Sequence, residues 1–223
     1  MPRHGAAGAM SGLVLHGYWR SSASYRVRLA LALKGIDYAQ VTHDLRLGEQ
    51  SAPDYLALAP HGLVPALEHD GGVLIESPAI LEWIEARWPS PALLPGDPDA
   101  AAMVRAMVAL VACDIHPLAN LRVLKTLRQD FGASEDQVQA WMADWIGRGF
   151  TALESLVARH GGRFAFGDHP TLADCVIVPQ VYNARRFAVP LEAYPRLVAA
   201  AEALLALPAA GAAHPDRQPD AAG

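Results

Sequence analysis

The stretch that decides the fold is Tyr18-Trp19-Arg20-Ser21-Ser22-Ala23-Ser24-Tyr25-Arg26-Val27-Arg28-Leu29-Ala30-Leu31, which joins a short apolar strand to an amphipathic helix through a hydroxyl-rich turn. Ser21, Ser22 and Ser24 supply oxygens that can cap the helix. The first N–H groups of a helix have no partner within it and lie at the positive end of its dipole, so they favour a carboxylate, a phosphate or a thiolate. Taken alone, the turn indicates only a capped helix, and an anion site needs support from the rest of the chain.

The composition is that of an ordinary globular protein with a substantial core. The chain has 223 residues, of which 52% are hydrophobic and 18% charged, and its net charge is -5 with histidine neutral. This length suffices for one large domain or two small ones. Nucleic acid is not expected as a partner, because phosphate binding needs clustered Lys and Arg and the sequence has no basic run.

No membrane partner and no secretory signal are expected. Arg105 and Asp114 interrupt the apolar stretch 101–118, and no run approaches the roughly 20 apolar residues that a membrane helix needs. The first ten residues lack the apolar core of a secretory signal. Residues 1–12 are therefore predicted to be a flexible leader, with Met10 as an alternative start.

The two cysteines, Cys113 and Cys175, lie in apolar helical patterns. Such cysteines are typical of small buried side chains in a reducing compartment, which predicts a cytoplasmic protein without disulfides. His116 lies three residues after Cys113, but Asp114 between them at a helix end does not make a zinc site. No metal is predicted.

The prolines divide the chain into an α/β part and a helical part. Periodicity in residues 13–90 predicts strands at Val14–Tyr18, Tyr38–His43, Leu63–Leu67 and Val73–Ile75, and helices at Ser24–Leu33 and Ser77–Trp88. This order indicates a βαβ unit followed by a hairpin. Residues 91–98 cannot hold a helix and are predicted to be a linker, residues 99–210 a helical domain, and residues 211–223 a loosely held tail.

Two patterns in the helical part are interpreted as folding signals. A stripe at three- and four-residue steps predicts the buried face of one long helix and consists of Val138, Trp141, Met142, Trp145, Leu153 and Leu156. Thr171 and Asp174 form a hydroxyl-x-x-acid box before an apolar run, which predicts the start of another helix.

Two further turns of the first domain carry groups that suit an anion. Pro65 interrupts a strand-like run, and one way to keep that strand is a cis peptide bond that turns the Val64 backbone outward to pair with an extended ligand. Glu76 and Ser77 stand where a strand pair gives way to a helix. Three such turns in one small domain predict a cleft that binds a peptide-like anion.

Six sequence words carry a family resemblance. They are Arg20-Ser21-Ser22-Ala23-Ser24-Tyr25-Arg26-Val27-Arg28, Leu63-Val64-Pro65-Ala66-Leu67, Glu76-Ser77-Pro78-Ala79-Ile80, Cys113-Asp114-Ile115-His116-Pro117-Leu118, Pro179-Gln180-Val181 with Asn183-Ala184-Arg185-Arg186-Phe187, and His214-Pro215-Asp216-Arg217-Gln218-Pro219-Asp220. They follow the family's order from about Leu13 to Asp220. On these words the chain resembles the zeta class of the glutathione transferase family, and within it the bacterial maleylacetoacetate isomerases.

The resemblance implies a thioredoxin-like domain that binds glutathione as cofactor, an all-helical domain that adds substrate contacts, and a homodimer. It implies that Ser21 and Ser22 hold the glutathione sulfur and that Val64, beside a cis Pro65, pairs with the cysteinyl part. The γ-glutamyl end is assigned to Glu76 and Ser77, and further glutathione contacts to Gln50, His116, Asn120 and Arg122. The carboxylates of a small dicarboxylate substrate are assigned to Arg20, Arg122 and Arg186.

The chain departs from the family pattern at two positions. Ala23 stands where the family turn reads Ser-Ser-Cys, so any role of that thiol is absent. Ala59 precedes Pro60 where the family usually has Asn, which loosens the turn ahead of Val64. Neither change removes an oxygen or a backbone donor from the implied thiol site.

The implied activity is glutathione-dependent cis–trans isomerisation. Hydrogen bonds from Ser21 or Ser22 and the helix N-terminus lower the pKa of the glutathione thiol. The thiolate adds to the cis double bond of a diketo acid, the new single bond rotates, and expulsion of glutathione leaves the trans isomer, with Arg20, Arg122 or Arg186 stabilising the enolate. The main interpretation is conversion of maleylacetoacetate into fumarylacetoacetate in the catabolism of aromatic amino acids. The same reaction on maleylpyruvate stays open, as does a glutathione-binding protein or general glutathione transferase without this activity.

Overall fold

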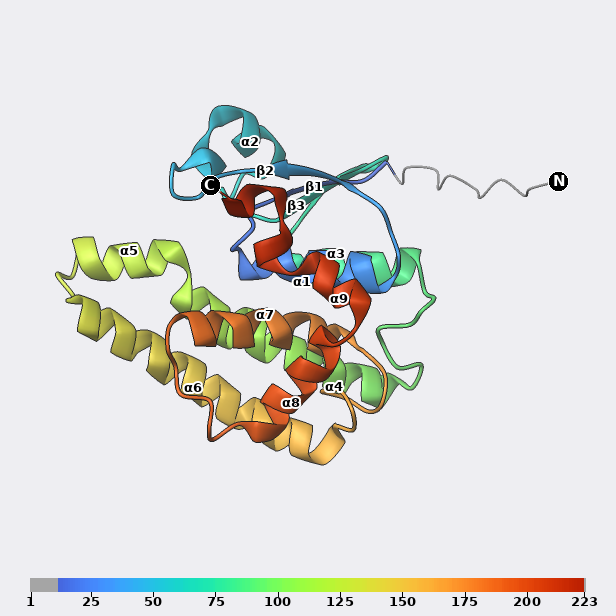
Figure 1. The fold of residues 1–223 in the computed structure, drawn as a ribbon. Coiled ribbons are helices and arrows are strands. Elements are labelled where there is room, and N and C mark those ends of the chain that lie inside the picture. The colour runs from blue at the N-terminus through green and yellow to red at the C-terminus, as the bar shows by residue number, and fades with distance from the viewer. Residues whose placement is uncertain (1–11, 223) are drawn as a thin grey trace.

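The computed structural model describes residues 12–222, so the predicted leader lies outside the described residues except for Gly12 (Figure 1). The first part of the chain forms a mixed sheet in the order β2-β1-β3-β4. Its strands are β1 (Val14–Gly17), β2 (Ala39–Thr42), β3 (Ala66–His69) and β4 (Gly72–Ile75). β1 is parallel to β2 and antiparallel to β3, and β3 and β4 form a hairpin. The predicted βαβ unit followed by a hairpin is confirmed.

Helices cover both faces of this sheet. They are α1 (Ser22–Leu33), α2 (Pro53–Leu58) and α3 (Ser77–Arg87), with a 3-10 turn at Glu49–Ser51. Figure 1 shows α1 and α3 on the side that faces the rest of the molecule and α2 on the other. The α1 helix begins two residues earlier than predicted because Ser21 has extended backbone angles and its Oγ accepts a hydrogen bond from Ser24 N at 3.2 Å.

The strand predicted over Leu63–Leu67 begins only at Ala66. Pro65 has no N–H to donate to a ladder, and the Leu63 carbonyl accepts a hydrogen bond from Tyr55 Oη at 2.6 Å instead of one from a neighbouring strand. This side of the sheet has its own small core under α2, formed by Tyr18, Tyr55, Ala59, Val64 and Ala66.

The second part of the chain is helical, as predicted. It comprises α4 (Pro98–Ala109), a π-helix (Leu110–Ile115), a 3-10 helix (His116–Ala119), α5 (Leu121–Gln129), α6 (Glu135–His160), α7 (Leu172–Arg186), α8 (Pro195–Leu205), α9 (Pro208–Ala213) and 3-10 turns at Pro215–Arg217 and Pro219–Ala222. The α7 helix packs against α1, α4 and α8 and is buried from Leu172 to Val181. One apolar core therefore runs through both parts of the chain.

Of the two folding signals of this part, the hydroxyl-x-x-acid box is confirmed and the stripe is confirmed in part. Val138, Met142 and Leu153 of the predicted stripe are buried on α6, whereas Trp141, Trp145 and Leu156 are half-buried. The Asp174 carboxylate accepts hydrogen bonds from Thr171 N at 2.8 Å, Thr171 Oγ1 at 3.0 Å and Ala165 N at 2.8 Å, which fixes the start of α7.

The expectation that both cysteines are buried is wrong for Cys113. Cys175 is buried and Cys113 is exposed, and both are free thiols. The physical reason is helical spacing: Val111 and Ile115, four residues apart, face the core, and Cys113, two residues from each, lies on the opposite side.

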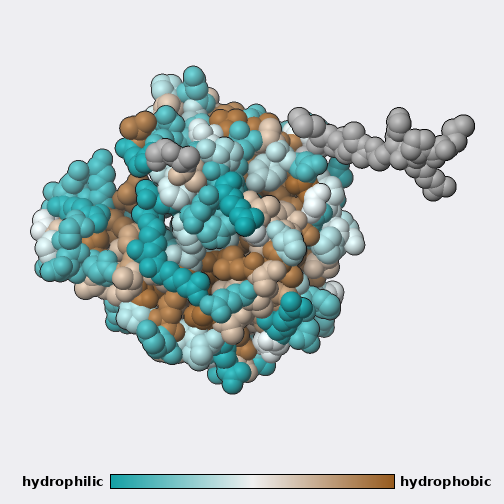
Figure 2. All heavy atoms as spheres, in the orientation of Figure 1, coloured by the Kyte–Doolittle hydropathy of each residue, from teal (hydrophilic) through white to brown (hydrophobic). Residues whose placement is uncertain are grey.

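Residues 98–129 form one helical stretch that is long and apolar enough, by length and composition alone, to cross a membrane. The stretch changes from α to π to 3-10 geometry and restarts at Asn120. Its first two segments pack against α6 and α7, and Figure 2 shows hydrophilic side chains over α5 at the left of the molecule. We interpret the stretch as helices of the core.

The end of the chain is held more firmly than predicted. The Gln218 side chain is buried and donates hydrogen bonds to the carbonyls of Ala212 and His214 at 3.1 and 2.9 Å. Asp220 Oδ2 accepts a hydrogen bond from Trp19 N at 2.9 Å. The composition of residues 211–222 favours a loose tail, and these contacts with residues up to 201 positions away override it.

Candidate active site

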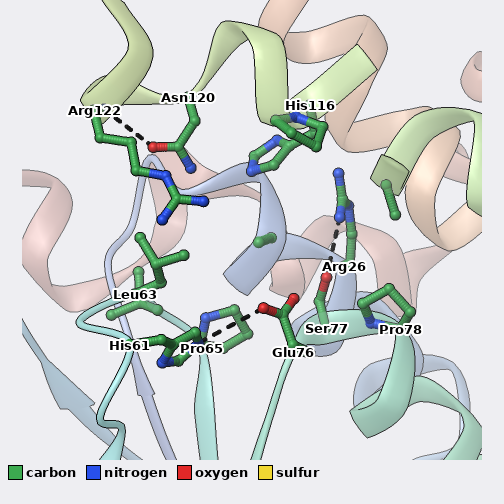
Figure 3. Close-up of a pocket in the computed structure, with 14 residues that line it drawn as sticks. Arg26, His61, Leu63, Pro65, Glu76, Ser77, Pro78, His116, Asn120 and Arg122 are labelled. Carbon is green, nitrogen blue, oxygen red and sulfur yellow. Dashed lines mark hydrogen bonds and ion pairs between the residues drawn. The ribbon is translucent and has the colours of Figure 1, made fainter. Parts of the chain in front are cut away.

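A pocket lies where the α/β part meets the helical part (Figure 3). Its walls come from the start of α1, the segment before β3, the start of α3, and the π and 3-10 helices with the start of α5. The structure brings the following predicted site residues together around it: Val64, Pro65, Glu76, Ser77, His116, Asn120 and Arg122. These residues are up to 58 positions apart between Val64 and Arg122, so the pocket is a product of the fold.

Val64 forms the wall nearest the sheet. The Val64–Pro65 peptide bond is cis, as predicted, and the Val64 side chain packs into the small core under α2. Within the described residues, the N–H and C=O of Val64 make no hydrogen bond. An extended peptide ligand can therefore pair with this backbone as it pairs with the edge of a sheet.

The opposite wall is built on the start of α3. Glu76 has a positive φ of 67° and an exposed carboxylate, whereas Ser77 is buried. The Ser77 Oγ accepts a hydrogen bond from Arg26 Nη1 at 3.0 Å. Because this oxygen already accepts, the hydroxyl hydrogen remains available to a ligand oxygen, next to the N–H groups that begin the helix.

Arg26 is a pocket residue that sequence reasoning missed. It is 2% exposed, and among residues 12–222 its Nε and Nη2 have no hydrogen-bond partner. Burial lowers the pKa of Arg26 to about 10, so the guanidinium is still charged at neutral pH. An unpaired buried cation is costly, and an anion bound in the pocket compensates it. The sequence feature that could have identified Arg26 is its position four residues after Ser22, which places the two residues on the same side of the helix.

The wall from the helical part carries His116, Asn120 and Arg122. Figure 3 shows these three side chains across the pocket from Glu76 and Ser77. Burial, together with the nearby Arg26 charge, lowers the pKa of His116 to about 3. The ring is thus neutral and can both donate and accept. Asn120 Oδ1 accepts a hydrogen bond from Arg122 N at 3.1 Å, which caps the start of α5, where Arg122 lies.

The serine turn lies at the margin of this pocket. Ala23 lines the pocket, whereas Ser21 and Ser22 directly before it do not. Ser21 Oγ caps α1 by accepting from Ser24 N, and its hydrogen remains free to donate. The start of α1 therefore borders the pocket at Ala23, and the two serines lie just beyond its walls.

Gln50 also lies outside the pocket walls. Its carbonyl is next to Gly62, where an added Cβ would meet Gln50 O at 3.4 Å, and Gly62 precedes the pocket residue Leu63. The Gln50 Oε1 atom is buried and, in the part of the chain that the structure describes, has no hydrogen-bond partner.

Arg20 and Arg186 form a separate pair of cations beside the serine turn. Arg20 precedes Ser21, and Arg186 is in the last turn of α7. Burial, and after it the positive charge of Arg20, lowers the pKa of Arg186. Each also lies over an aromatic ring, Arg20 over Trp19 at 4.9 Å and Arg186 over Phe187 at 4.7 Å. Two like charges placed together favour a ligand with two negative charges.

Comparison with known proteins agrees with this architecture. The glutathione S-transferase N-terminal domain matches residues 20–87, and the glutathione S-transferase C-terminal domain matches residues 123–203. Maleylacetoacetate isomerase of Pseudomonas aeruginosa is 51% identical over 209 residues, which cover 92% of this chain and 97% of that protein.

Two solved structures extend the likeness to three dimensions. A maleylpyruvate isomerase, described as a bacterial zeta-class glutathione S-transferase in its holo form, has a TM-score of 0.91 at 49% identity and covers 93% of this chain and 99% of its own. Maleylacetoacetate isomerase from Anaeromyxobacter dehalogenans 2CP-1 with bound glutathione has a TM-score of 0.85 at 48% identity over 94% of this chain and 97% of its own. The predicted fold, a thioredoxin-like domain followed by a helical domain, is confirmed, and the chain belongs to the glutathione S-transferase family.

Proposed function

We propose that this protein is a glutathione-dependent cis–trans isomerase of the zeta class that converts maleylacetoacetate into fumarylacetoacetate in the catabolism of aromatic amino acids such as tyrosine. The observation that carries the proposal is the placement of two arginines, one from each domain, beside the serine turn that begins α1. This arrangement provides a thiol-activating turn and a dicarboxylate site next to each other. The similarity to maleylacetoacetate isomerases supports it.

Glutathione fits the pocket as an extended peptide with an amino-acid group at one end. The γ-glutamyl carboxylate binds Ser77 and the Arg26 charge behind it, and its ammonium binds Glu76. The cysteinyl part pairs with the Val64 backbone beside Pro65, which directs its sulfur toward Ser21 and Ser22. His116, Asn120 and Arg122 close the pocket from the helical side, and Gln50 contacts the glycyl end near Gly62.

The chemistry begins with the glutathione thiol. The hydroxyls of Ser21 and Ser22 and the N-terminus of α1 stabilise the thiolate and lower its pKa. The thiolate adds to the cis double bond, and the electron pair of that bond moves into the adjacent carbonyl as an enolate. Arg20 and Arg186 bind the carboxylates and stabilise the developing charge. After rotation about the new single bond the enolate collapses, the C–S bond breaks, and the trans product and glutathione thiolate are released.

Maleylpyruvate is the second candidate substrate. The solved maleylpyruvate isomerase superposes with a TM-score of 0.91, and its 49% identity is close to the 51% of the maleylacetoacetate isomerase from P. aeruginosa. The two acids share the cis double bond between a carboxylate and a carbonyl, so the same residues serve both. The site therefore accommodates either acid as substrate.

The test follows the absorbance of each cis acid with and without glutathione. The proposal expects turnover only with glutathione, and loss of most turnover in the Ser21→Ala/Ser22→Ala double variant. The ratio of kcat/KM values identifies the preferred acid. Isomerisation of neither acid by protein that binds glutathione would contradict the proposal and leave a glutathione transferase or binding protein of another function.

The protein is further proposed to act as a homodimer in the cytoplasm. Large apolar side chains are exposed in both domains, among them Leu47 at 76% and Phe131 at 76%. Single exposed apolar side chains are also normal on monomers, so the dimer rests on the resemblance to the zeta class. Sedimentation velocity over a range of concentrations tests the dimer, and fractionation of the producing cells tests the location.

A further inference from the structure

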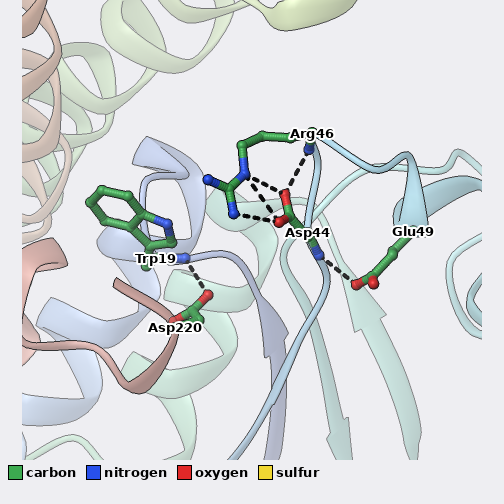
Figure 4. Close-up of polar contacts among 5 residues, drawn as sticks. All are labelled: Trp19, Asp44, Arg46, Glu49 and Asp220. Atoms are coloured by element: carbon green, nitrogen blue, oxygen red, sulfur yellow. Dashed lines mark hydrogen bonds and ion pairs between the residues drawn. The ribbon is translucent and has the colours of Figure 1, made fainter. Parts of the chain in front are cut away.

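The motif His214-Pro215-Asp216-Arg217-Gln218-Pro219-Asp220 lies outside the pocket walls, yet the fold returns it to the active-site turn. Gln218 folds the segment back on itself through its bonds to the carbonyls of Ala212 and His214. The segment then ends in the 3-10 turn Pro219–Ala222, from which Asp220 reaches Trp19. Figure 4 shows the Asp220 carboxylate below the backbone N–H of Trp19.

The turn from Tyr18 to Ser21 is held at several of its backbone groups. Its own hydrogen bond runs from Ser21 N to Tyr18 O at 3.0 Å. Arg28 Nη2 donates to Trp19 O at 2.9 Å and Arg28 Nη1 to Tyr18 O at 3.4 Å, while Asp220 Oδ2 accepts from Trp19 N at 2.9 Å. Arg20 therefore follows a residue, Trp19, whose backbone N–H and C=O are both held by side chains.

Arg28 connects this turn to the tail a second time. Its Nε donates to the carbonyl of Ala213, the last residue of α9, at 3.1 Å. The side chain is 1% exposed and lies between the turn and the tail. A change in the tail is thus transmitted to Tyr18 and Trp19 through Arg28 as well as through Asp220.

The same segment contacts the helix that carries Arg186. Tyr182 Oη donates to Asp216 Oδ1 at 3.4 Å, and the Tyr182 ring packs edge-on against His214 with centroids 5.5 Å apart. Tyr182 is one helical turn before Arg186 on α7. The tail therefore touches the neighbour of Arg20 at one end and the helical turn before Arg186 at the other.

We propose that residues 214–220 are a positioning segment that sets the separation of Arg20 and Arg186, and with it the length of dicarboxylate that the site accepts, with Asp220 as its principal positioning residue. The inference rests on the proposed function for the roles of the two arginines. The segment is hydrogen-bonded to Trp19 on one side and to Tyr182 of α7 on the other, so it connects the two elements that carry the arginines, whose like charges repel each other. Substrate specificity then depends on a segment that does not contact the substrate.

The test compares Asp220→Ala with two matched variants. Asp220→Asn keeps an oxygen that accepts from Trp19 N. Arg217→Ala removes an exposed side chain of the same segment that, among residues 12–222, forms no hydrogen bond or ion pair with the turn or with α7. Asp220→Ala should raise KM for the cis acid about tenfold, as expected for loss of one hydrogen bond to a charged group, and leave glutathione affinity within about twofold. In Asp220→Asn and Arg217→Ala, both KM for the cis acid and glutathione affinity should stay near the values of the parent protein.

A second readout measures the proposed separation without turnover. Calorimetry measures the binding of succinate, glutarate and adipate to the glutathione-loaded protein. The parent protein should prefer one chain length; Asp220→Ala should reduce this preference and Asp220→Asn should keep it. The Tyr182→Phe variant, which removes only the hydroxyl that donates to Asp216, should flatten it in the same direction and remains informative where Asp220→Ala does not fold.

The outcomes separate this inference from the proposed function. If the parent protein isomerises neither cis acid but Asp220→Ala flattens its preference among dicarboxylates, the function is wrong and the positioning segment stands. If the parent isomerises and Asp220→Ala changes neither KM nor the length preference, the positioning segment is wrong. It is equally overturned when Asp220→Asn raises KM and flattens the length preference as much as Asp220→Ala does. It is also overturned when Asp220→Ala weakens glutathione binding alone.

Discussion

Replacing both hydroxyls of the serine turn separates thiol activation from helix capping. Ser21 does two things in the structure: its Oγ accepts from Ser24 N at 3.2 Å, and its hydrogen is available to the ligand sulfur. Ser21→Ala removes both, and the lost N-cap costs about 1 kcal/mol of stability. Ser21→Gly removes the same hydroxyl, but glycine is tolerated at an N-cap and costs only a few tenths of that. We compare both in a Ser22→Ala background so that the second hydroxyl cannot compensate.

The expected size of the catalytic effect follows from the hydrogen bond. A bond to a charged group contributes about 1.5 to 3 kcal/mol, which corresponds to about one to two pKa units of the bound thiol. Both double variants should therefore show a raised thiol pKa, and turnover at neutral pH should fall about ten- to a hundredfold. Since the defect is one of ionisation, raising the pH should restore much of the turnover, while glutathione affinity changes less.

The assay titrates the ultraviolet absorption of the glutathione thiolate in the complex and compares it with the pH profile of kcat. Melting temperatures measured alongside should fall further for the alanine version than for the glycine version. An unchanged thiol pKa in both double variants would refute the argument and leave the turn as a helix cap. Turnover that tracks melting temperature, with the glycine version active and the alanine version inactive, would refute it as well.

Three further changes test other parts of the site. Arg26→Met should weaken glutathione binding by at least about tenfold in titration calorimetry, because Ser77 loses its donor and the pocket its charge, and Arg26→Lys should restore only part of the affinity because a single ammonium does not reproduce the guanidinium fork. His116 has a folded pKa of about 3 against an ordinary value of 6.5, so it makes stability fall as the pH drops through 6.5; His116→Gln should remove about 1.4 kcal/mol of this loss per pH unit in urea unfolding at mildly acidic pH, and an unchanged pH dependence would contradict the assignment. Arg186→Lys should raise KM for the cis acid although the charge is kept, with glutathione affinity unchanged, and wild-type kinetics would move the carboxylate role to Arg122.

The sequence determines the fold at those positions where local chemistry and long-range packing agree. A hydroxyl on an extended residue suffices to cap a helix in any context: Thr171 caps α7 where predicted, and Ser21, one of three serines predicted as capping residues, starts α1 two residues before the predicted start. The strand start at Ala66 is a different case, because it depends on a hydrogen bond from Tyr55 to the Leu63 carbonyl. The partner of Leu63 has no local sequence signal.

The candidate site follows the same division, and the arginines of α1 show why. Arg26 and Arg28 are about 200° apart around the helix, so they face opposite sides. Arg26 turns toward the pocket and Ser77, whereas Arg28 turns toward the tail and the backbone of the serine turn. In the sequence both read as ordinary charges on an amphipathic helix, because the surfaces that bury them come from α3, α7 and α9. A helix buried on all sides can keep two cations only where each has polar groups to bind. Arg28 donates to three backbone carbonyls, and Arg26 donates to one hydroxyl and leaves the remainder of its hydrogen-bonding capacity to the ligand.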